Sequence, residues 1–148
     1  MGAKFIHNNW IPNQLDDYPY ACIELKTCAT KEIPDVFAWN YYTSCVLEAK
    51  VSKSDFLRDL KKPFRINPKD GVGENRFFIC EEGLILPAEV PENWGLIYAS
   101  KDGCNIVKSA VNQVSNFKAE RGIITSIFRR ENNEQKVYSY GLNFTKES

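Results

Sequence analysis

Residues 33–63 read IPDVFAWNYYTSCVLEAKVSKSDFLRDLKKP, and this stretch decides the fold that we expect for the chain. Apolar residues dominate 33–39 and 45–51, and the polar and aromatic run NYYTS separates the two segments. Two short apolar runs joined by such a turn are typical of a β-hairpin. With the turn centred between Tyr41 and Tyr42, Asp35 lies directly opposite Glu48, and Cβ atoms of opposed residues are about 4.5–5.5 Å apart.

Lys50 is two residues beyond Glu48 and shares its face of the strand, because side chains alternate between the two faces. The other face carries an apolar set that we expect to be buried, namely Cys45, Leu47, Ala49 and Val51. This register therefore gathers two carboxylates and a lysine on one face of the hairpin.

Two carboxylates at that separation repel each other unless a cation lies between them. Mg²⁺ prefers oxygen ligands, and Asp35, Glu48 and the backbone carbonyl of Ala49 would supply three of them. Bound Mg²⁺ or Mn²⁺ would activate water and offset charge on a phosphodiester, while Lys50 would contact the water or the scissile phosphate. The competing interpretation is an ordinary surface pair, because alternating charge on a strand also marks a solvated edge.

The segments around the hairpin predict one α/β domain. Ser52 and Asp55 begin a helix over 52–62 as a variant capping box, and Pro63 ends it. Apolar spacing predicts another helix over 19–29. The remaining expected elements are a loop over 64–75, strands over 76–82, 94–100 and 104–111, a helix over 117–130 and a short strand over 137–144. We expect a mixed β-sheet flanked by helices, with a core over about 15–130 between polar terminal segments.

Composition excludes several classes of protein. The 148 residues carry 19 Lys and Arg against 19 Asp and Glu, which argues against a histone-like nucleic-acid binder. The five cysteines show no C-x-x-C spacing and the chain has one histidine, His7, which argues against a disulfide scaffold and a zinc or multi-histidine site. No apolar run reaches the roughly 18 residues of a membrane span, so we expect a soluble, cytoplasmic protein.

Pro34-Asp35 followed by Glu48-Ala49-Lys50 resembles the PD-(D/E)-x-K signature of the restriction-endonuclease-like nuclease superfamily. The runs LEAKVSKSDFLRDLKKPFR and RFFICEEGLILPAEVPENWGLIYAS are similar to motifs of its MmcB-like, DNA-repair-associated branch. The resemblance covers roughly residues 20–130. The chain departs from that branch at Pro63, where an aromatic residue is expected, and in the long stretch that follows.

The resemblance implies a restriction-endonuclease-like mixed sheet and a metal-dependent DNA endonuclease or DNA-repair protein. Asp35 and Glu48 would be metal ligands, Lys50 the catalytic lysine, and Glu24 a further acid on the first helix. DNA is the implied partner, with a second copy of the chain or a repair protein as a further one and no membrane.

Two basic strips are candidates for contact with phosphates. The first comprises Lys53, Arg58, Lys61, Lys62 and Arg65, and the second comprises Arg129 and Arg130. Trp39, Tyr41 and Tyr42 at the hairpin tip would stack on an unpaired base or cap the core. Two alternatives remain open: a protein of the same fold that binds nucleic acid or a partner without cutting, and a small interaction module with an aromatic surface.

Overall fold

The hairpin has the register that the sequence predicts. In the computed structural model, which describes residues 18–25, 27 and 32–130, Val36 pairs with Leu47 in an antiparallel ladder. Continuing this register by one residue places Asp35 opposite Glu48. The predicted juxtaposition of these two residues is therefore confirmed.

Asn40 closes the turn of the hairpin. Its side-chain Oδ1 accepts hydrogen bonds from the backbone N–H groups of Tyr42 and Thr43, both at 2.8 Å. Its own N–H donates to the carbonyl of Thr43 at 3.0 Å. Asparagine is common in turns because its side chain can satisfy backbone donors in this way.

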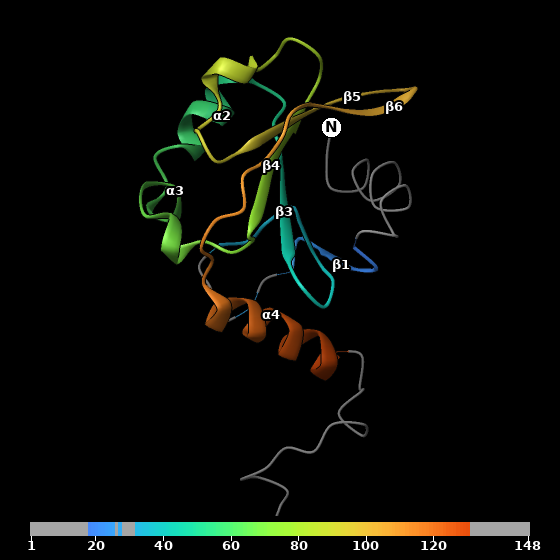
Figure 1. Cartoon of the computed structure of the whole chain (residues 1–148), viewed down its shortest axis with the longest axis vertical. Helices are drawn as coiled ribbons and strands as arrows, with labels where there is room; N and C mark the ends of the chain where they lie inside the picture. Colours follow the sequence, from blue (N-terminus) through green and yellow to red (C-terminus); the bar gives the residue numbers. More distant parts are fainter. Residues whose placement is uncertain (1–17, 26, 28–31, 131–148) are drawn as a thin grey trace, which may run out of the picture.

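Figure 1 shows the elements arranged around one twisted sheet. Their bounds are β1 (Tyr20–Ile23), β2 (Val36–Trp39), β3 (Ser44–Ala49), α2 (Lys53–Asp59), α3 (Pro63–Ile66), η2 (Pro68–Asp70), β4 (Asn75–Cys80), η3 (Pro87–Glu89), β5 (Gly95–Ser100), β6 (Gly103–Lys108) and α4 (Phe117–Arg130). The six strands lie in the order β1-β2-β3-β4-β5-β6.

The sheet is mixed. Strands β1, β2 and β3 form an antiparallel meander, β4 and β5 continue it in parallel, and β6 returns antiparallel. A parallel neighbour needs a crossover connection, and α2 and α3 provide the one between β3 and β4. The predicted class, one α/β domain with a mixed sheet and flanking helices, is confirmed.

The two faces of the sheet have different neighbours. One face carries the buried cluster Val36, Ala38, Cys45, Leu47, Ile79, Ile97 and Ala99. On the other face, Phe56 of α2 packs against Phe78 and Trp94, while Ala119 and Ile123 of α4 pack against Phe37 and Val46. We call this second side the helical face.

The helix predicted over 19–29 is wrong where the structure describes that segment. Residues Tyr20–Ile23 form β1, which pairs with β2 over four residues. Ala21 packs against one buried cluster and Cys22 against the cluster on the helical face, the period-two pattern of a strand. A short apolar run fits both periods, and here pairing with β2 decides the outcome.

Two smaller expectations need correction, and others concern residues that the structure does not describe. Val51 is 62 % exposed, so the buried set on its face ends at Ala49. The loop predicted over 64–75 contains most of α3 and all of η2, because Pro63 begins a helical turn as well as ending α2. The strand predicted over 137–144, His7 and Cys28 lie outside the described residues.

Candidate functional site

Asp35 and Glu48 meet on the helical face at the ends of β2 and β3. Asp35 directly precedes β2, and one Oδ2 oxygen accepts a hydrogen bond from the backbone N–H of Ala49 at 2.7 Å. A side-chain hydrogen bond also joins Asp35 to Glu48. The predicted neighbours are therefore in direct contact.

Pro34 gives this end of the hairpin an unusual backbone. In the register of β2 and β3, Pro34 lies opposite Ala49. Proline has no N–H group, so it cannot donate to the Ala49 carbonyl in the antiparallel ladder. The Ala49 N–H, in turn, is satisfied by the Asp35 carboxylate.

Lys50 is buried together with Glu48, so the solvated-edge interpretation does not hold. Its Nζ lies 3.3 Å from Oδ1 of Asp59, and both side chains are almost fully buried. Its backbone N–H continues the sheet by donating to Ile79 at 2.9 Å. Helix α2 thus presents Asp59 to the lysine of the strand, and the exposed end of Lys62 approaches the same carboxylate oxygen at 2.7 Å.

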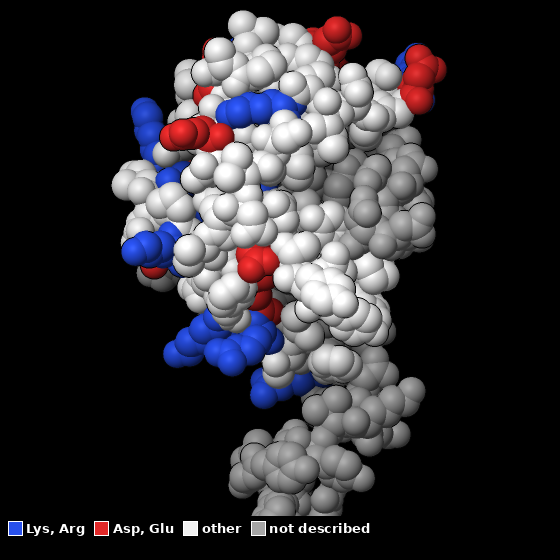
Figure 2. Space-filling model, viewed as in Figure 1, with Lys and Arg blue, Asp and Glu red and all other residues white. Residues whose placement is uncertain are grey.

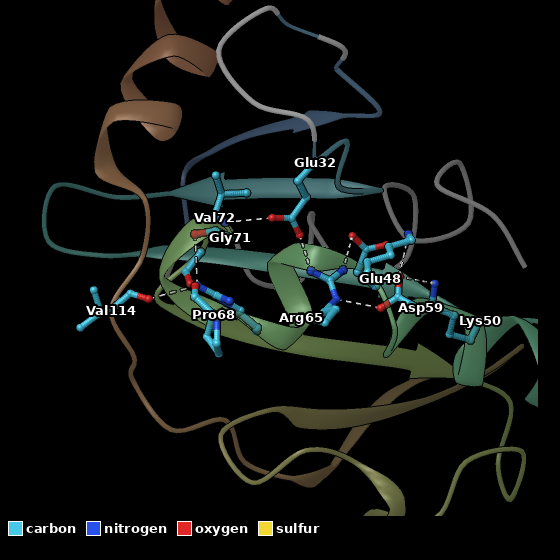
Figure 3. A network of polar contacts seen from close by, with 12 residues as sticks. Glu32, Glu48, Lys50, Asp59, Arg65, Pro68, Gly71, Val72 and Val114 are labelled. Carbon is cyan, nitrogen blue, oxygen red and sulfur yellow. Dashed lines mark hydrogen bonds and ion pairs between the residues drawn. The ribbon is translucent and has the colours of Figure 1, made fainter.

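Arg65 lies at the centre of the buried polar network (Figure 3). Its Nη1 donates to Glu32 at 2.5 Å and its Nε to Asp59 at 2.7 Å. Its Nη2 lies 3.1 Å from Oε1 of Glu48. The guanidinium also stacks over Trp94, with its carbon 4.6 Å from the ring centroid.

The prediction that Arg65 faces phosphates is wrong, because its side chain is 2 % exposed. The α2–α3 connection turns it inward toward three acids. A guanidinium suits this position because its planar fork can serve several carboxylates at once.

Glu32 is the buried acid that the sequence analysis missed. One oxygen receives Arg65, and the other accepts a hydrogen bond from the backbone N–H of Val72 at 2.9 Å. It joins the segment before β2 to α3 and to the segment before β4. Its position two residues before the Pro34-Asp35 pair is the local signal that could have found it.

The pKa of Glu48 is raised to about 8. Burial is the main cause, and the nearby carboxylates of Asp35 and Asp59 add to it, while Arg65 and Lys50 act in the opposite direction. Burial also raises the pKa of Asp35, although the Ala49 N–H and Lys50 oppose this shift. At neutral pH the Glu48 carboxyl therefore keeps its proton and can donate it to Asp35 in their hydrogen bond.

Asp59 has the opposite balance. Burial alone would raise its pKa, but Arg65, Lys62 and Lys50 together hold the pKa below its usual value. Asp59 is thus a permanent anion that fixes Lys50. A single buried network therefore contains two kinds of carboxyl. Asp35 and Glu48 have raised pKa values and favour a bound proton, whereas Asp59 is an anion surrounded by cations.

The structure does not bring Glu24 to the site in the way that the resemblance implies. Glu24 follows β1, its φ is +48°, and its side chain is exposed. Its backbone N–H donates to the carbonyl of Asp35 at 3.0 Å. The first helix that was expected to carry it is replaced by β1.

The remaining residues of the first basic strip have mixed surroundings. Arg58 and Lys61 are exposed on or just after α2. Lys62 is half-exposed beside Asp59, and Lys53 forms an ion pair with Glu89. Arg58, Lys61 and Lys62 thus remain accessible to phosphates, and Lys53 is shared with an acid.

The oxygen set at the end of the hairpin fits a hard divalent cation. It comprises the carboxyls of Asp35 and Glu48 and the Ala49 carbonyl that Pro34 leaves without a ladder donor. Such sets suit Mg²⁺, which keeps several waters and takes few protein ligands. Within residues 18–25, 27 and 32–130, no three His, Cys, Asp or Glu side chains converge to hold a metal, so the carbonyl would be needed.

Comparison with known proteins adds a fold relationship. No family model and no curated protein matches the chain. The solved structure of the SPO1766 protein of unknown function from Silicibacter pomeroyi is similar, with a TM-score of 0.54 and 20 % identity. The match covers 82 % of this chain and 84 % of that one, so the two share their fold. In the part of the chain that the structure describes, no helix has the length and apolar character to cross a membrane.

Proposed function

We propose that this protein hydrolyses phosphodiester bonds in DNA, with Mg²⁺ or Mn²⁺ held by Asp35, Glu48 and the Ala49 carbonyl. The observation that carries the proposal is the meeting of the two carboxyls beside a carbonyl that Pro34 cannot satisfy. The PD…E-x-K spacing and the motifs of the MmcB-like branch support it. A DNA substrate also agrees with a cytoplasmic protein that has free thiols at Cys22, Cys45, Cys80 and Cys104.

Each residue of the chain has a defined task in this proposal. Asp35 and Glu48 supply anionic oxygens, and Glu48 gives up its proton when the cation is bound. A bound divalent ion supplies an activated water and offsets charge on the phosphate. Lys50 stabilises negative charge that develops at the phosphate or orients the water, and Asp59 holds the ammonium group in position.

The buried surroundings strengthen these electrostatic effects. Charges interact more strongly where water is excluded, and Glu48, Lys50 and Asp59 are all buried. Arg58, Lys61 and Lys62 border this network on the exposed side of the α2 region and would contact phosphates of the bound strand.

The experiment that tests the proposal is a cleavage panel of duplex, single-stranded, flapped and branched DNA in Mg²⁺, in Mn²⁺ and in EDTA. We expect metal-dependent cleavage that Asp35→Asn and Lys50→Ala abolish or slow strongly. Asp102→Asn, which changes an exposed carboxylate in the β5–β6 turn, is the matched control and should cut like the wild type. Cleavage that persists in EDTA, or in Asp35→Asn, would refute the assignment.

A second function is favoured by one observation. Arg65 already pairs with Glu48, and Asp59 already pairs with Lys50, so two groups of the signature have partners within the protein. A network neutralised in this way would suit a protein that binds nucleic acid without cutting it. Binding with unchanged affinity in Mg²⁺ and in EDTA, and no cleavage of any substrate, would establish this alternative.

A further inference from the structure

An apolar pocket of about 680 Å³ lies between the β1–β2 end of the sheet and α4. It is distinct from the carboxylate site, since neither Asp35 nor Glu48 lines it. Its walls include the aromatic rings of Tyr20, Trp39, Tyr41 and Phe128, and Arg130 stands among its lining residues. A volume of this size falls in the range of ligand pockets.

The aromatic wall of this pocket is held in place by the hairpin. Trp39 and Tyr20 are stacked, with ring centroids 5.7 Å apart and planes 23° apart. Tyr41 is 86 % exposed and hydrogen-bonds the side chain of Tyr20. The turn itself depends on Asn40, so Tyr41 is not needed to close it.

Helix α4 is basic: Arg130 lines the pocket, and Arg121 lies three and seven residues before the lining residues Ile124 and Phe128. Lys118, Arg121 and Arg129 are exposed, at spacings that place them along one side of the helix. Over 117–130 the one acid is Glu120, which is buried and bonded to Ser115. Figure 2 shows Lys and Arg gathered over α4 on this side of the molecule.

We propose that this pocket takes an unpaired base of a single-stranded nucleic acid, whose phosphates lie along α4. Aromatic faces stack on any base, and a neighbouring row of cations follows the backbone. A base inside a duplex cannot enter the pocket without leaving its stack. The proposal rests on the proposed function for its ligand and names the structural class of the substrate.

The pocket and the carboxylate site can serve the same strand. Trp39 lies four residues along β2 from Asp35, which corresponds to about 13 Å of extended chain. Both side chains belong to the helical face, because residues 35, 37 and 39 alternate with the opposite set. Phe37 lies between them, buried beneath Ala119 and Ile123 of α4. A strand that serves both sites would therefore pass around α4 and not along β2.

The test compares three ligands by fluorescence anisotropy in EDTA at low salt, where no cleavage occurs. The ligands are a labelled oligothymidylate of about 15 nucleotides, an abasic strand of the same length and charge, and a duplex of the same length. We expect the oligothymidylate to bind about 5- to 150-fold more tightly than the abasic strand, because one base stacked on aromatic rings contributes that much.

Two kinds of variant separate stacking from charge. Tyr41→Ala should weaken binding of the oligothymidylate several-fold and leave binding of the abasic strand unchanged. Tyr42→Ala is the matched control, because this neighbour is 91 % exposed and does not line the pocket. Arg121→Glu with Arg129→Glu should weaken both strands and flatten the salt dependence, while Lys101→Glu in the β5–β6 turn should not.

Several results would overturn the proposal. These are equal affinity for the abasic strand, equal loss in Tyr41→Ala and Tyr42→Ala, or tighter binding of the duplex. A dimer that forms without nucleic acid and that Phe128→Glu dissociates would assign the pocket to a second copy instead. Because binding is measured in EDTA, base-dependent binding without any metal-dependent cleavage would refute the proposed function and leave this inference standing.

Discussion

Glu48 shows how one buried residue combines two requirements. Its surroundings must be apolar enough for the carboxyl to keep its proton at neutral pH. Nearby cations must also stabilise the carboxylate once that proton leaves. Burial supplies the first condition, and Arg65 and Lys50 supply the second. The same carboxyl is therefore neutral in the free protein and would become an anion in the proposed cation site.

The raised pKa of Glu48 predicts a pH dependence of stability. Glu48 titrates near 4.5 when unfolded and at about 8 when folded, so unfolding releases its proton between these values. Stability is then fully present below the lower value and falls as pH rises through the window, by at most about 1.4 kcal/mol per pH unit from this group. Urea unfolding at several pH values measures the slope.

Glu48→Gln should flatten that slope, because glutamine cannot titrate. Glu81→Gln changes an exposed carboxylate beyond β4 and is the control. If Glu48→Gln and the wild type show the same slope between these pH limits, Glu48 does not hold a proton in the folded protein.

At the scale of elements, α3 is a short helix whose main contribution is one side chain. Arg65 ties it to the segment before β2 through Glu32, to β3 through Glu48 and to α2 through Asp59. The four elements meet at a single guanidinium. The position of α3 is thus set by charge as well as by apolar packing.

Loss of this guanidinium should be costly. Arg65→Met leaves buried carboxylates without their cation, and breaking a buried pair in this way costs about 3–5 kcal/mol. Arg65→Lys should recover only part of the loss, because an ammonium group cannot reach three acids in the same geometry. Urea unfolding measures both variants, with the exposed Arg58→Lys as control. A cost near zero for Arg65→Met would show that the network does not stabilise the fold.

The contact between β4 and β5 depends on a missing side chain. Gly95 pairs with Phe77, and a Cβ at Gly95 would lie 2.4 Å from the Phe77 ring. Such a Cβ would also lie 2.8 Å from the backbone nitrogen of Ala110. Gly95→Ala should therefore destabilise the protein by about 1–3 kcal/mol, because the ring and this backbone must both move. Thermal unfolding measures this cost.

A second substitution tests the cause. Phe77→Leu together with Gly95→Ala should cost less than the sum of the two single changes, since the smaller side chain leaves room for the methyl group. Additive costs would place the strain at the Ala110 backbone and not at the ring.

The elements that the sequence predicted correctly are those with local signals. The hairpin register follows from alternation and from a turn of polar residues, and the start of α2 follows from Ser52, whose hydroxyl accepts the Asp55 N–H as expected. β1 was missed because its four residues fit two periods and pairing with β2 decides between them. The sequence of a segment is thus sufficient to predict the hairpin and the start of α2, whereas β1 can be predicted only when its pairing partner is known.

The residues of the candidate site also differ in whether a local signal predicts their position. Asp35, Glu48 and Lys50 could be grouped from strand geometry alone. The position of Arg65 could not, because its partner Glu32 is 33 residues away and both belong to charged segments, where exposure is the usual expectation. Only the α2–α3 connection brings them together.

At the scale of the whole molecule, the proposed cation site predicts that Mg²⁺ or Mn²⁺ stabilises the fold. Mg²⁺ or Mn²⁺ at 100 times its Kd contributes about 2.7 kcal/mol, which raises Tm by roughly 5–10 °C for a domain of this size. Asp35→Asn should abolish this increase, and Asp102→Asn should keep it. Differential scanning calorimetry in metal and in EDTA measures the shift, and an equal shift in Asp35→Asn would place the ion elsewhere.

The strand order β1-β2-β3-β4-β5-β6 has a consequence for how the chain folds during synthesis. Each strand after β1 pairs with a strand that has already been synthesised, so no strand has to insert between two strands that are already paired. Helix α4 is different, because it follows β6 yet covers Phe37 and Val46 on strands made much earlier. A ribosome adds about 5–20 residues per second, so these two side chains wait several seconds for their cover. The helical face of β2 and β3 is therefore the surface that a chaperone would meet on the nascent chain.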